Sequence, residues 1–423
     1  MVNSRMMRNK MQPSGILSRT FSRCFVVFIG LILGPWILAP VLICKEAETK
    51  FLGVFTHTEH FLPFDQQLES AQELLQKNSH IHGVSIRAAW KYLNPQDGTV
   101  DTESLQRLIQ FLVSKDMWIY INLIPGNHST PDWLYQKGAR KFVTEGFRAN
   151  KIPYTPVPWN PIYMKEWESF LEKVAPLINR EEKLFSVVVL GHNTDMEMHM
   201  PSAMEDMAAW KKLGWKPDVV YENWCHWVDV YARLFPKKKL MLVLSQMYGT
   251  DTVDFPARIA TYAIQKYPDR IILSNHQLQG RFDYMNASDP QHGALIQFRD
   301  KAPGCWECLG SWLEQPERQG SVDMAVLNTL KANPLFIQIW NRDAKADPKY
   351  AREIDEKFNA YVSLGYEELK KKLQKEGLYL TKEQDTWSRE KEKAVSQPKS
   401  ESPLLNRWQK YRDSFFNKPE EKK

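Results

Sequence analysis

The chain contains eight short apolar runs, separated by longer segments in which polar and apolar residues are mixed. The runs are rich in β-branched and aromatic residues and alternate little between polar and apolar positions. This pattern is typical of parallel strands that are buried on both faces. The eight predicted strands cover residues 51–56, 83–88, 117–124, 184–190, 239–245, 270–274, 293–298 and 335–340.

Helical periodicity dominates the segments between these runs. Leu105, Leu108, Ile109 and Leu112 share one face of a predicted helix that begins after Asp101 or Thr102 as N-cap. Similar patterns predict helices at residues 102–115, 162–178, 218–234, 321–332 and 348–375.

The repeated strand–helix order predicts an α/β fold, a (β/α)8 TIM barrel over residues 50–378. A doubly wound sheet is the alternative architecture. No G-x-G-x-x-G motif follows an early strand, so nothing in the sequence favours nucleotide binding.

The two ends of the chain differ from the barrel region. Residues 1–24 are basic, and residues 25–44 form an uncharged apolar stretch that is long enough to cross a bilayer. This stretch predicts either a transmembrane anchor or a cleaved signal peptide, which places the barrel on the extracytoplasmic side of a membrane. Residues 379–402 look like a charged linker, and residues 403–417 have the pattern of an amphipathic helix.

Composition narrows the possible functions. The 423 residues are 43% hydrophobic and 25% charged, which excludes a wholly disordered chain or a coiled coil. The net charge of +6 lies largely at the ends, which favours membrane topology over a nucleic-acid partner. The fifteen tryptophans favour a wet cleft, an interface or a membrane border, and their ring faces also suit the stacking of sugars. The single C-x-x-C, at Cys305 and Cys308, has no second ligand pair, so it predicts a disulfide or two plain thiols and not zinc.

In a barrel of this type, functional residues follow the carboxyl ends of the strands. His57 and Glu59 follow the first predicted strand, and Arg87 and Trp90 end the second. His57 and His60 around Glu59 could bind a metal or hydrogen-bond a ligand; without further ligands in view we expect no metal and no cofactor. Arg87 could orient a carboxylate or sugar hydroxyls, or form a salt bridge inside the barrel mouth.

Three motifs in this region resemble those of a known group of enzymes. The pattern G-V-x-I-R-x-x-W-x-x-L-x-P-x-x-G-x-x-D covers residues 83–101, Thr130-Pro131-Asp132-Trp133-Leu134 follows, and Pro156 to Pro161 precede Trp167. Their order and spacing resemble the clan A glycoside hydrolases, especially the β-galactosidase type, over residues 51 to 200. The resemblance implies a TIM barrel with a sugar-binding cleft.

The resemblance also implies a general acid/base after the fourth strand, a glutamate that an asparagine directly precedes. Here Asn193 and Glu197 are four residues apart, and Asp195 lies between them. We assign the acid/base role to Glu197 and place His192, Asn193 and Asp195 among the sugar-binding residues. Local capping or pairing by Glu197 is the alternative interpretation.

The nucleophile of a retaining enzyme in this clan follows the seventh strand. At the predicted seventh strand stands Gln297, which cannot attack an anomeric carbon. Glu307, in the segment that follows, is the candidate for the second catalytic carboxylate, and Gln297 and Trp340 are candidate ligand contacts. The sequence thus predicts a glycoside hydrolase-like protein acting on a β-linked carbohydrate. The alternative is a catalytically inactive carbohydrate-binding or partner-docking surface protein of the same fold.

Overall fold

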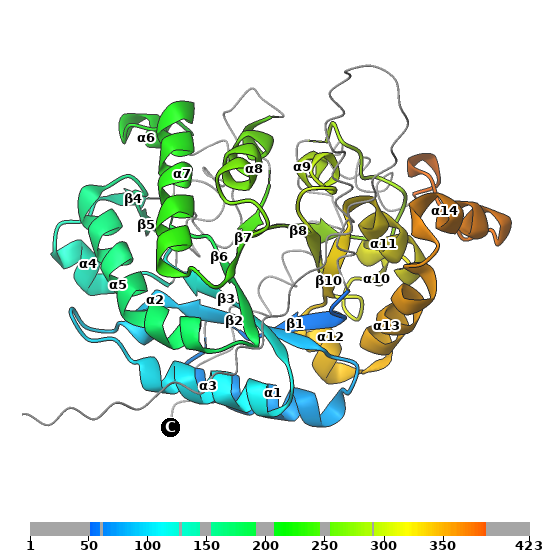
Figure 1. The fold of residues 1–423 in the computed structure, drawn as a ribbon, viewed down its shortest axis with the longest axis horizontal. Coiled ribbons are helices and arrows are strands. Elements are labelled where there is room, and N and C mark those ends of the chain that lie inside the picture. Colours follow the sequence, from blue (N-terminus) through cyan, green and yellow to red (C-terminus); the bar gives the residue numbers. More distant parts are fainter. Residues whose placement is uncertain are drawn as a thin grey trace, which may run out of the picture. The chain divides into compact units, whose positions relative to one another are not determined.

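The computed structural model describes residues 51–59, 62–126, 129–143, 154–191, 207–245, 254–289 and 292–385. Eight parallel strands close into a barrel, with the helices around it (Figure 1). In chain order the barrel strands are β1 (Val54–His57), β2 (Gly83–Ala89), β3 (Trp118–Ile124), β6 (Leu184–Val188), β7 (Lys239–Val243), β8 (Ile271–Leu278), β9 (Gly304–Cys308) and β10 (Pro334–Gln338). The predicted (β/α)8 barrel is therefore confirmed for the described part of the chain.

Where the segment after a barrel strand is described, it contains at least one helix. The helices are α1 (Phe64–Lys77), α2 (Trp90–Leu93), α3 (Thr102–Ser114), α4 (Asp132–Gln136), α5 (Pro161–Arg180), α6 (Met207–Lys212), α7 (Pro217–Leu234), α8 (Phe255–Lys266), α9 (Gly293–Gln297), α10 (Pro316–Gln319), α11 (Val322–Thr329), α12 (Asn341–Ala346), α13 (Lys349–Tyr361) and α14 (Gly365–Lys375). Two short strands, β4 (Lys141–Val143) and β5 (Tyr154–Pro156), form a separate antiparallel pair.

Seven of the eight predicted strands are present, and one is wrong. The run predicted at residues 293–298 contains helix α9 (Gly293–Gln297), whereas the seventh barrel strand, β9, begins eleven residues after the start of that helix. A short apolar run does not by itself distinguish a buried strand from a short helix. The segment Gly304–Cys308 escaped the pattern because it contains Glu307, although all five of its residues are buried.

Helix boundaries agree well with the periodicity. The side chain of Asp101 accepts hydrogen bonds from the backbone N–H groups of Glu103 and Ser104, so Asp101 is the N-cap of α3. The single helix predicted for residues 348–375 is two helices, α13 and α14. Gly365, with φ of +70°, starts the second one.

The core has two layers on either side of the barrel wall. Inside the barrel, an apolar cluster that includes Phe55, Tyr120, Cys305 and Phe336 fills the space between the strands. A larger cluster packs the outer faces of the strands against the helices. The inner cluster closes the interior of the barrel and leaves the polar residues nearer the carboxyl ends of the strands.

The chain after α14 remains packed on this part of the molecule. Asp385 is buried and forms an ion pair with Arg281 at 2.8 Å, and the carbonyl of Leu380 accepts a hydrogen bond from the N–H of Asp283. Residues 379–385, the start of the predicted linker, are thus fixed to the loop that follows β8. The rest of that linker and the amphipathic helix predicted at 403–417 lie outside the described residues.

No helix in the described part of the chain is long and apolar enough to cross a membrane. The apolar stretch at 25–44 and the basic segment before it lie outside that part, so the anchor or signal peptide stays a prediction.

Candidate active site

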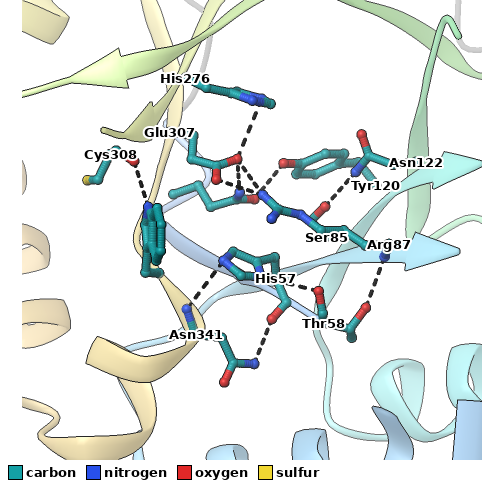
Figure 2. A network of polar contacts seen from close by, with 12 residues as sticks. His57, Thr58, Ser85, Arg87, Tyr120, Asn122, His276, Glu307, Cys308 and Asn341 are labelled. Atoms are coloured by element: carbon teal, nitrogen blue, oxygen red, sulfur yellow. Dashed lines mark hydrogen bonds and ion pairs between the residues drawn. The ribbon is translucent and has the colours of Figure 1, made fainter. Parts of the chain in front are cut away.

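A layer of polar side chains lies at the carboxyl ends of the strands, inside the barrel (Figure 2). Because side chains alternate across a strand, the residue two positions after an inner apolar residue points to the same interior. Phe55 and Cys305, both in the inner cluster, are followed in this way by His57 and Glu307. The polar layer consists of His57, Arg87, Asn122, His276, Glu307 and Gln338.

Glu307 is the charged centre of this layer. Its side chain, 9% exposed, accepts hydrogen bonds at 2.7 and 2.6 Å from Nη2 of Arg87, which is equally buried. His276 Nε2 lies 3.5 Å from Oε2 of Glu307, and the amide of Gln338 donates to the same oxygen at 2.6 Å.

These neighbours determine the ionisation of Glu307. Burial alone raises the pKa of this carboxyl, but the charge of Arg87, with the charges of His276 and His57 and the hydrogen bonds from Arg87, lowers it to about 2. Glu307 is therefore an ionised carboxylate at neutral pH. An ionised carboxylate can act as a nucleophile or accept a proton, but it cannot act as a general acid.

Glu307 occupies a definite place in the barrel. It lies in β9, the seventh barrel strand, one residue before the strand ends. This is the strand after which the resemblance places the nucleophile. The sequence analysis placed Glu307 in the segment after the seventh strand, whereas the structure places it in that strand.

His57 and Trp340 lie beside one another at the same end of the barrel. Their rings are 6.5 Å apart in an edge-to-face arrangement. The indole N–H of Trp340 donates to the carbonyl of Cys308 at 2.8 Å, and the side-chain amide of Asn341 donates to the carbonyl of His57 at 2.6 Å. Trp340 is half-buried. Glu59 follows β1 and is half-buried.

The structure contradicts the ligand contact predicted for Trp90 and places Gln297 in a helix instead of a barrel strand. Trp90 is 0% exposed and packs among Trp133, Trp167 and other aromatic side chains, so protein atoms cover its ring. Gln297 ends helix α9, and its amide donates to the carbonyl of Ala287 at 2.6 Å. The two cases have different causes: the end of a strand does not fix on which side of the barrel wall the Trp90 ring lies, whereas Gln297 belongs to a run that forms a helix and not the seventh strand.

Three residues of the polar layer received no role from the sequence, namely Asn122, His276 and Gln338. His276 lies beyond the run at 270–274, but β8 continues to Leu278 and brings it into the barrel. Gln338 lies inside a correctly predicted strand, two residues after Phe336 of the inner cluster. The alternation of inward-facing residues was the signal that could have identified Gln338.

His192, Asn193, Asp195 and Glu197 lie outside the described residues. The chain that leads to them is well fixed. The hydroxyl of Tyr163 donates to the carbonyl of Gly191 at 2.9 Å, and the indole of Trp167 donates to the carbonyl of Leu190 at 3.2 Å. Two aromatic residues of α5 therefore hold the end of the segment that follows β6, the fourth barrel strand.

Metal ligation receives no support in the part of the chain that is described. It contains no group of three or more His, Cys, Asp or Glu residues that could hold a metal ion. Cys305 and Cys308 are free, buried thiols whose pKa values burial raises. Cys305 belongs to the cluster inside the barrel and Cys308 to the cluster outside it. The predicted pair is thus two plain thiols.

Comparison with known proteins agrees with the motifs. Residues 63–212 match the family model described as β-galactosidase. No curated protein has a matching sequence. The chain is similar to the clan A glycoside hydrolases, as the motifs predict.

The solved structures to which this chain is similar differ widely from it in sequence. The catalytic domain of β-amylase from Paenibacillus polymyxa has 10% identity and a TM-score of 0.50, over 74% of this chain and 99% of that domain. A β-galactosidase from the psychrophilic Marinomonas ef1 has 13% identity and a TM-score of 0.45, over 76% of this chain and 61% of its own.

An exo-β-1,4-mannosidase from an Opitutaceae bacterium has 13% identity and a TM-score of 0.43, over 76% of this chain and 60% of its own. The chain therefore spans about 60% of the length of the mannosidase and of the β-galactosidase. The likeness to the β-amylase domain shows a glycoside hydrolase-like fold.

Proposed function

We propose that this protein is a retaining glycoside hydrolase that acts on a β-linked carbohydrate, with Glu307 as nucleophile and Glu197 as general acid/base. The observation that carries the proposal is the ionised carboxylate of Glu307 at the end of the seventh barrel strand, paired with Arg87. The resemblance of residues 83–101 to clan A enzymes supports the same assignment.

The reaction has two steps. A carboxylate oxygen of Glu307 forms a bond to the anomeric carbon, the glycosidic C–O bond breaks, and the leaving oxygen takes a proton from Glu197. Water then attacks the same carbon, gives a proton to the carboxylate of Glu197, and releases Glu307 from the sugar. Arg87 keeps Glu307 ionised for the first step and stabilises it again as it departs in the second.

A panel of 4-nitrophenyl β-glycosides of galactose, mannose, glucose and xylose tests the activity. We expect hydrolysis of at least one member with retention at the anomeric carbon, read by proton NMR. Glu307→Gln abolishes turnover, because the amide cannot attack. A 2-deoxy-2-fluoro glycoside of the same sugar traps the glycosyl-enzyme, and mass spectrometry locates the sugar on Glu307.

Glu314→Gln is the matched control. Glu314 is also paired with an arginine, Arg342 at 2.5 Å, but its side chain is 29% exposed in the loop after β9. This variant keeps wild-type turnover. If the wild-type protein hydrolyses no member of the panel, or if the product has inverted stereochemistry, the proposal fails.

A carbohydrate-binding protein without turnover is the second candidate. It is favoured by the contact of Arg87 Nη2 with both oxygens of Glu307, because a carboxylate held so strongly is a weak nucleophile. Titration with the free sugars, followed by tryptophan fluorescence, distinguishes the two. An enzyme altered at Glu197→Gln loses turnover and keeps its ligand, whereas a binding protein changes only in affinity.

We further propose that residues 25–44 anchor the protein in a membrane or direct its export, with the barrel on the extracytoplasmic side. The uncharged stretch after a basic segment supports this. In intact cells, a protease added outside should cleave the barrel region, and protection of the barrel would contradict the proposal.

A further inference from the structure

A chain of hydrogen bonds runs across the barrel interior and ends at Glu307. The hydroxyl of Tyr120, on β3, lies 2.5 Å from Oε1 of Gln338, on β10, and Nε2 of Gln338 lies 2.6 Å from Oε2 of Glu307. On the far side of Tyr120, Ser85 of β2 is hydrogen-bonded to its hydroxyl, and Nδ2 of Asn122 donates to Oγ of Ser85 at 2.7 Å. Figure 2 shows Tyr120, Ser85 and Asn122 side by side next to the Glu307–Arg87 pair.

The chemistry of the groups fixes the direction of every bond in this chain. An ionised carboxylate only accepts, so Gln338 must turn its NH2 group toward Glu307. Its amide oxygen then faces Tyr120, whose hydroxyl must donate. The phenol oxygen is left to accept from Ser85. All the donors therefore point toward Glu307, and such a chain strengthens each of its bonds.

The two oxygens of Glu307 are held unequally. Oε2 lies 2.6 Å from Arg87 Nη2, 2.6 Å from Gln338 Nε2 and 3.5 Å from His276 Nε2. Among the described residues, the hydrogen-bond partner of Oε1 is Arg87 Nη2, at 2.7 Å. Each carboxylate oxygen has two lone-pair positions, so Oε1 keeps one for a reacting carbon while Oε2 is fully engaged.

We propose that Tyr120, acting through Gln338, is a positioning residue that fixes the rotation of the Glu307 carboxylate, so that Oε1 is the oxygen that bonds to the sugar. This inference rests on the proposed function, because it names the reacting atom of that nucleophile. Tyr120 and Gln338 are both buried, and Tyr120 contacts neither oxygen of Glu307 directly.

Tyr120→Phe removes the donor that fixes the Gln338 amide and retains the ring in the inner cluster. The amide can then turn its oxygen toward Glu307, and Oε2 loses its anchor. We expect kcat to fall about tenfold with KM changed less than about twofold, since the lost interaction aligns a reacting atom and does not bind the sugar. The acid limb of the kcat/KM profile should move to higher pH by about half a pH unit, because a donor to the carboxylate is weakened.

The other groups that bear on this ionisation are the same in the variant. They are Arg87 on β2, His276 on β8, His57 on β1 and the thiol of Cys308 on β9. A movement of the acid limb on Tyr120→Phe therefore reports the hydrogen-bond chain itself.

Tyr361→Phe is the matched control. It removes a tyrosine hydroxyl that donates to a carboxylate, Asp323 at 3.0 Å, in the helical layer outside the barrel. This variant should keep wild-type kcat and the wild-type acid limb. If only Tyr120→Phe changes the kinetics, the change is not a general effect of losing a tyrosine hydroxyl that is bonded to a carboxylate or amide oxygen.

Two crystal structures complete the test. In wild-type enzyme trapped with a 2-fluoro glycoside, the sugar carbon should be bonded to the oxygen of Glu307 that does not face Gln338. In ligand-free Tyr120→Phe, the Gln338 amide and the carboxylate plane should be rotated. The inference is overturned if the sugar is on the oxygen that faces Gln338, or if Tyr120→Phe leaves the carboxylate plane and the acid limb unchanged.

The same experiments separate this inference from the proposed function. Absence of hydrolysis by the wild-type protein refutes the proposed function, and the ligand-free structures still show whether Tyr120 sets the rotation of the carboxylate. Retaining hydrolysis with an unchanged Tyr120→Phe variant refutes the inference alone.

Discussion

The Arg87–Glu307 pair provides the sharpest test of the electrostatics of the barrel. Arg87→Met keeps most of the side-chain volume and removes the charge, which leaves a buried carboxylate without its main partner. A pKa of about 2 for Glu307, against an ordinary value of 4.5, corresponds to about 3 kcal/mol in favour of the ionised form, because each pKa unit is worth about 1.4 kcal/mol. Breaking a buried pair on one side costs about 3–5 kcal/mol. We expect a loss of that size in the free energy of unfolding at pH 7.

The pH dependence should change sign. In the wild type the folded pKa is below the unfolded value, so this group stabilises the fold above about pH 4.5, and the stabilisation is lost as the pH falls toward 2. In Arg87→Met, burial dominates and raises the folded pKa of Glu307 above its unfolded value. The carboxyl is then neutral at low pH and costs little when buried, and stability is lost as the pH rises through the folded pKa. The difference in the free energy of unfolding between Arg87→Met and the wild type should therefore become smaller between pH 7 and pH 4.

Urea unfolding followed by tryptophan fluorescence, at pH 7 and at pH 4, measures both effects. Arg233→Met is the control, because Arg233 is 54% exposed and pairs with Glu168 and Glu172 on the surface. An exposed pair contributes less than about 1 kcal/mol. An equal loss of unfolding free energy in Arg87→Met and Arg233→Met, or a loss in Arg87→Met that grows as the pH falls, would show that Arg87 does not stabilise the ionised form of Glu307.

Two further predictions concern the segments on either side of the mouth. Gly191 has φ of +135°, and a Cβ there would lie 2.6 Å from the Trp227 ring, so Gly191→Ala should destabilise by about 2 kcal/mol or more and lower turnover by moving the chain that leads to Glu197. Gly98→Ala, with φ of +79° and nothing near its Cβ, should lose only about 1 kcal/mol and keep wild-type activity; equal losses in thermal unfolding would contradict the close contact. Asp385→Asn weakens the buried pair with Arg281, so limited proteolysis should cut residues 379–385 faster than in the wild type, and an unchanged rate would show that the pair does not hold this segment.

Much of the barrel could be predicted from the sequence, because buried parallel strands are short apolar runs and the helices between them have a regular period. The exception is informative. The run at 293–298 has the composition of a strand but forms α9, whereas Gly304–Cys308 carries a glutamate and forms β9. A charge inside a buried strand is stable only when another part of the chain neutralises it. The local sequence pattern does not show which residue that partner is.

The candidate site shows the same division. His57, Arg87 and Trp340 could be found because they follow or end recognisable strands. From the sequence, Trp90 looked like the same kind of ligand contact. Only the packed structure shows that its ring faces the helices and is buried.

The sequence by itself determined that strands and helices alternate and that the motif at residues 83–101 resembles that of the clan A glycoside hydrolases. Only the tertiary structure decided which carboxylate stands at the seventh strand, because Arg87 and Glu307 are 220 residues apart and meet when the barrel closes. The ionisation of Glu307 depends on that meeting, since burial raises the pKa of its carboxyl, whereas Arg87 together with His276 and His57 lowers it to about 2.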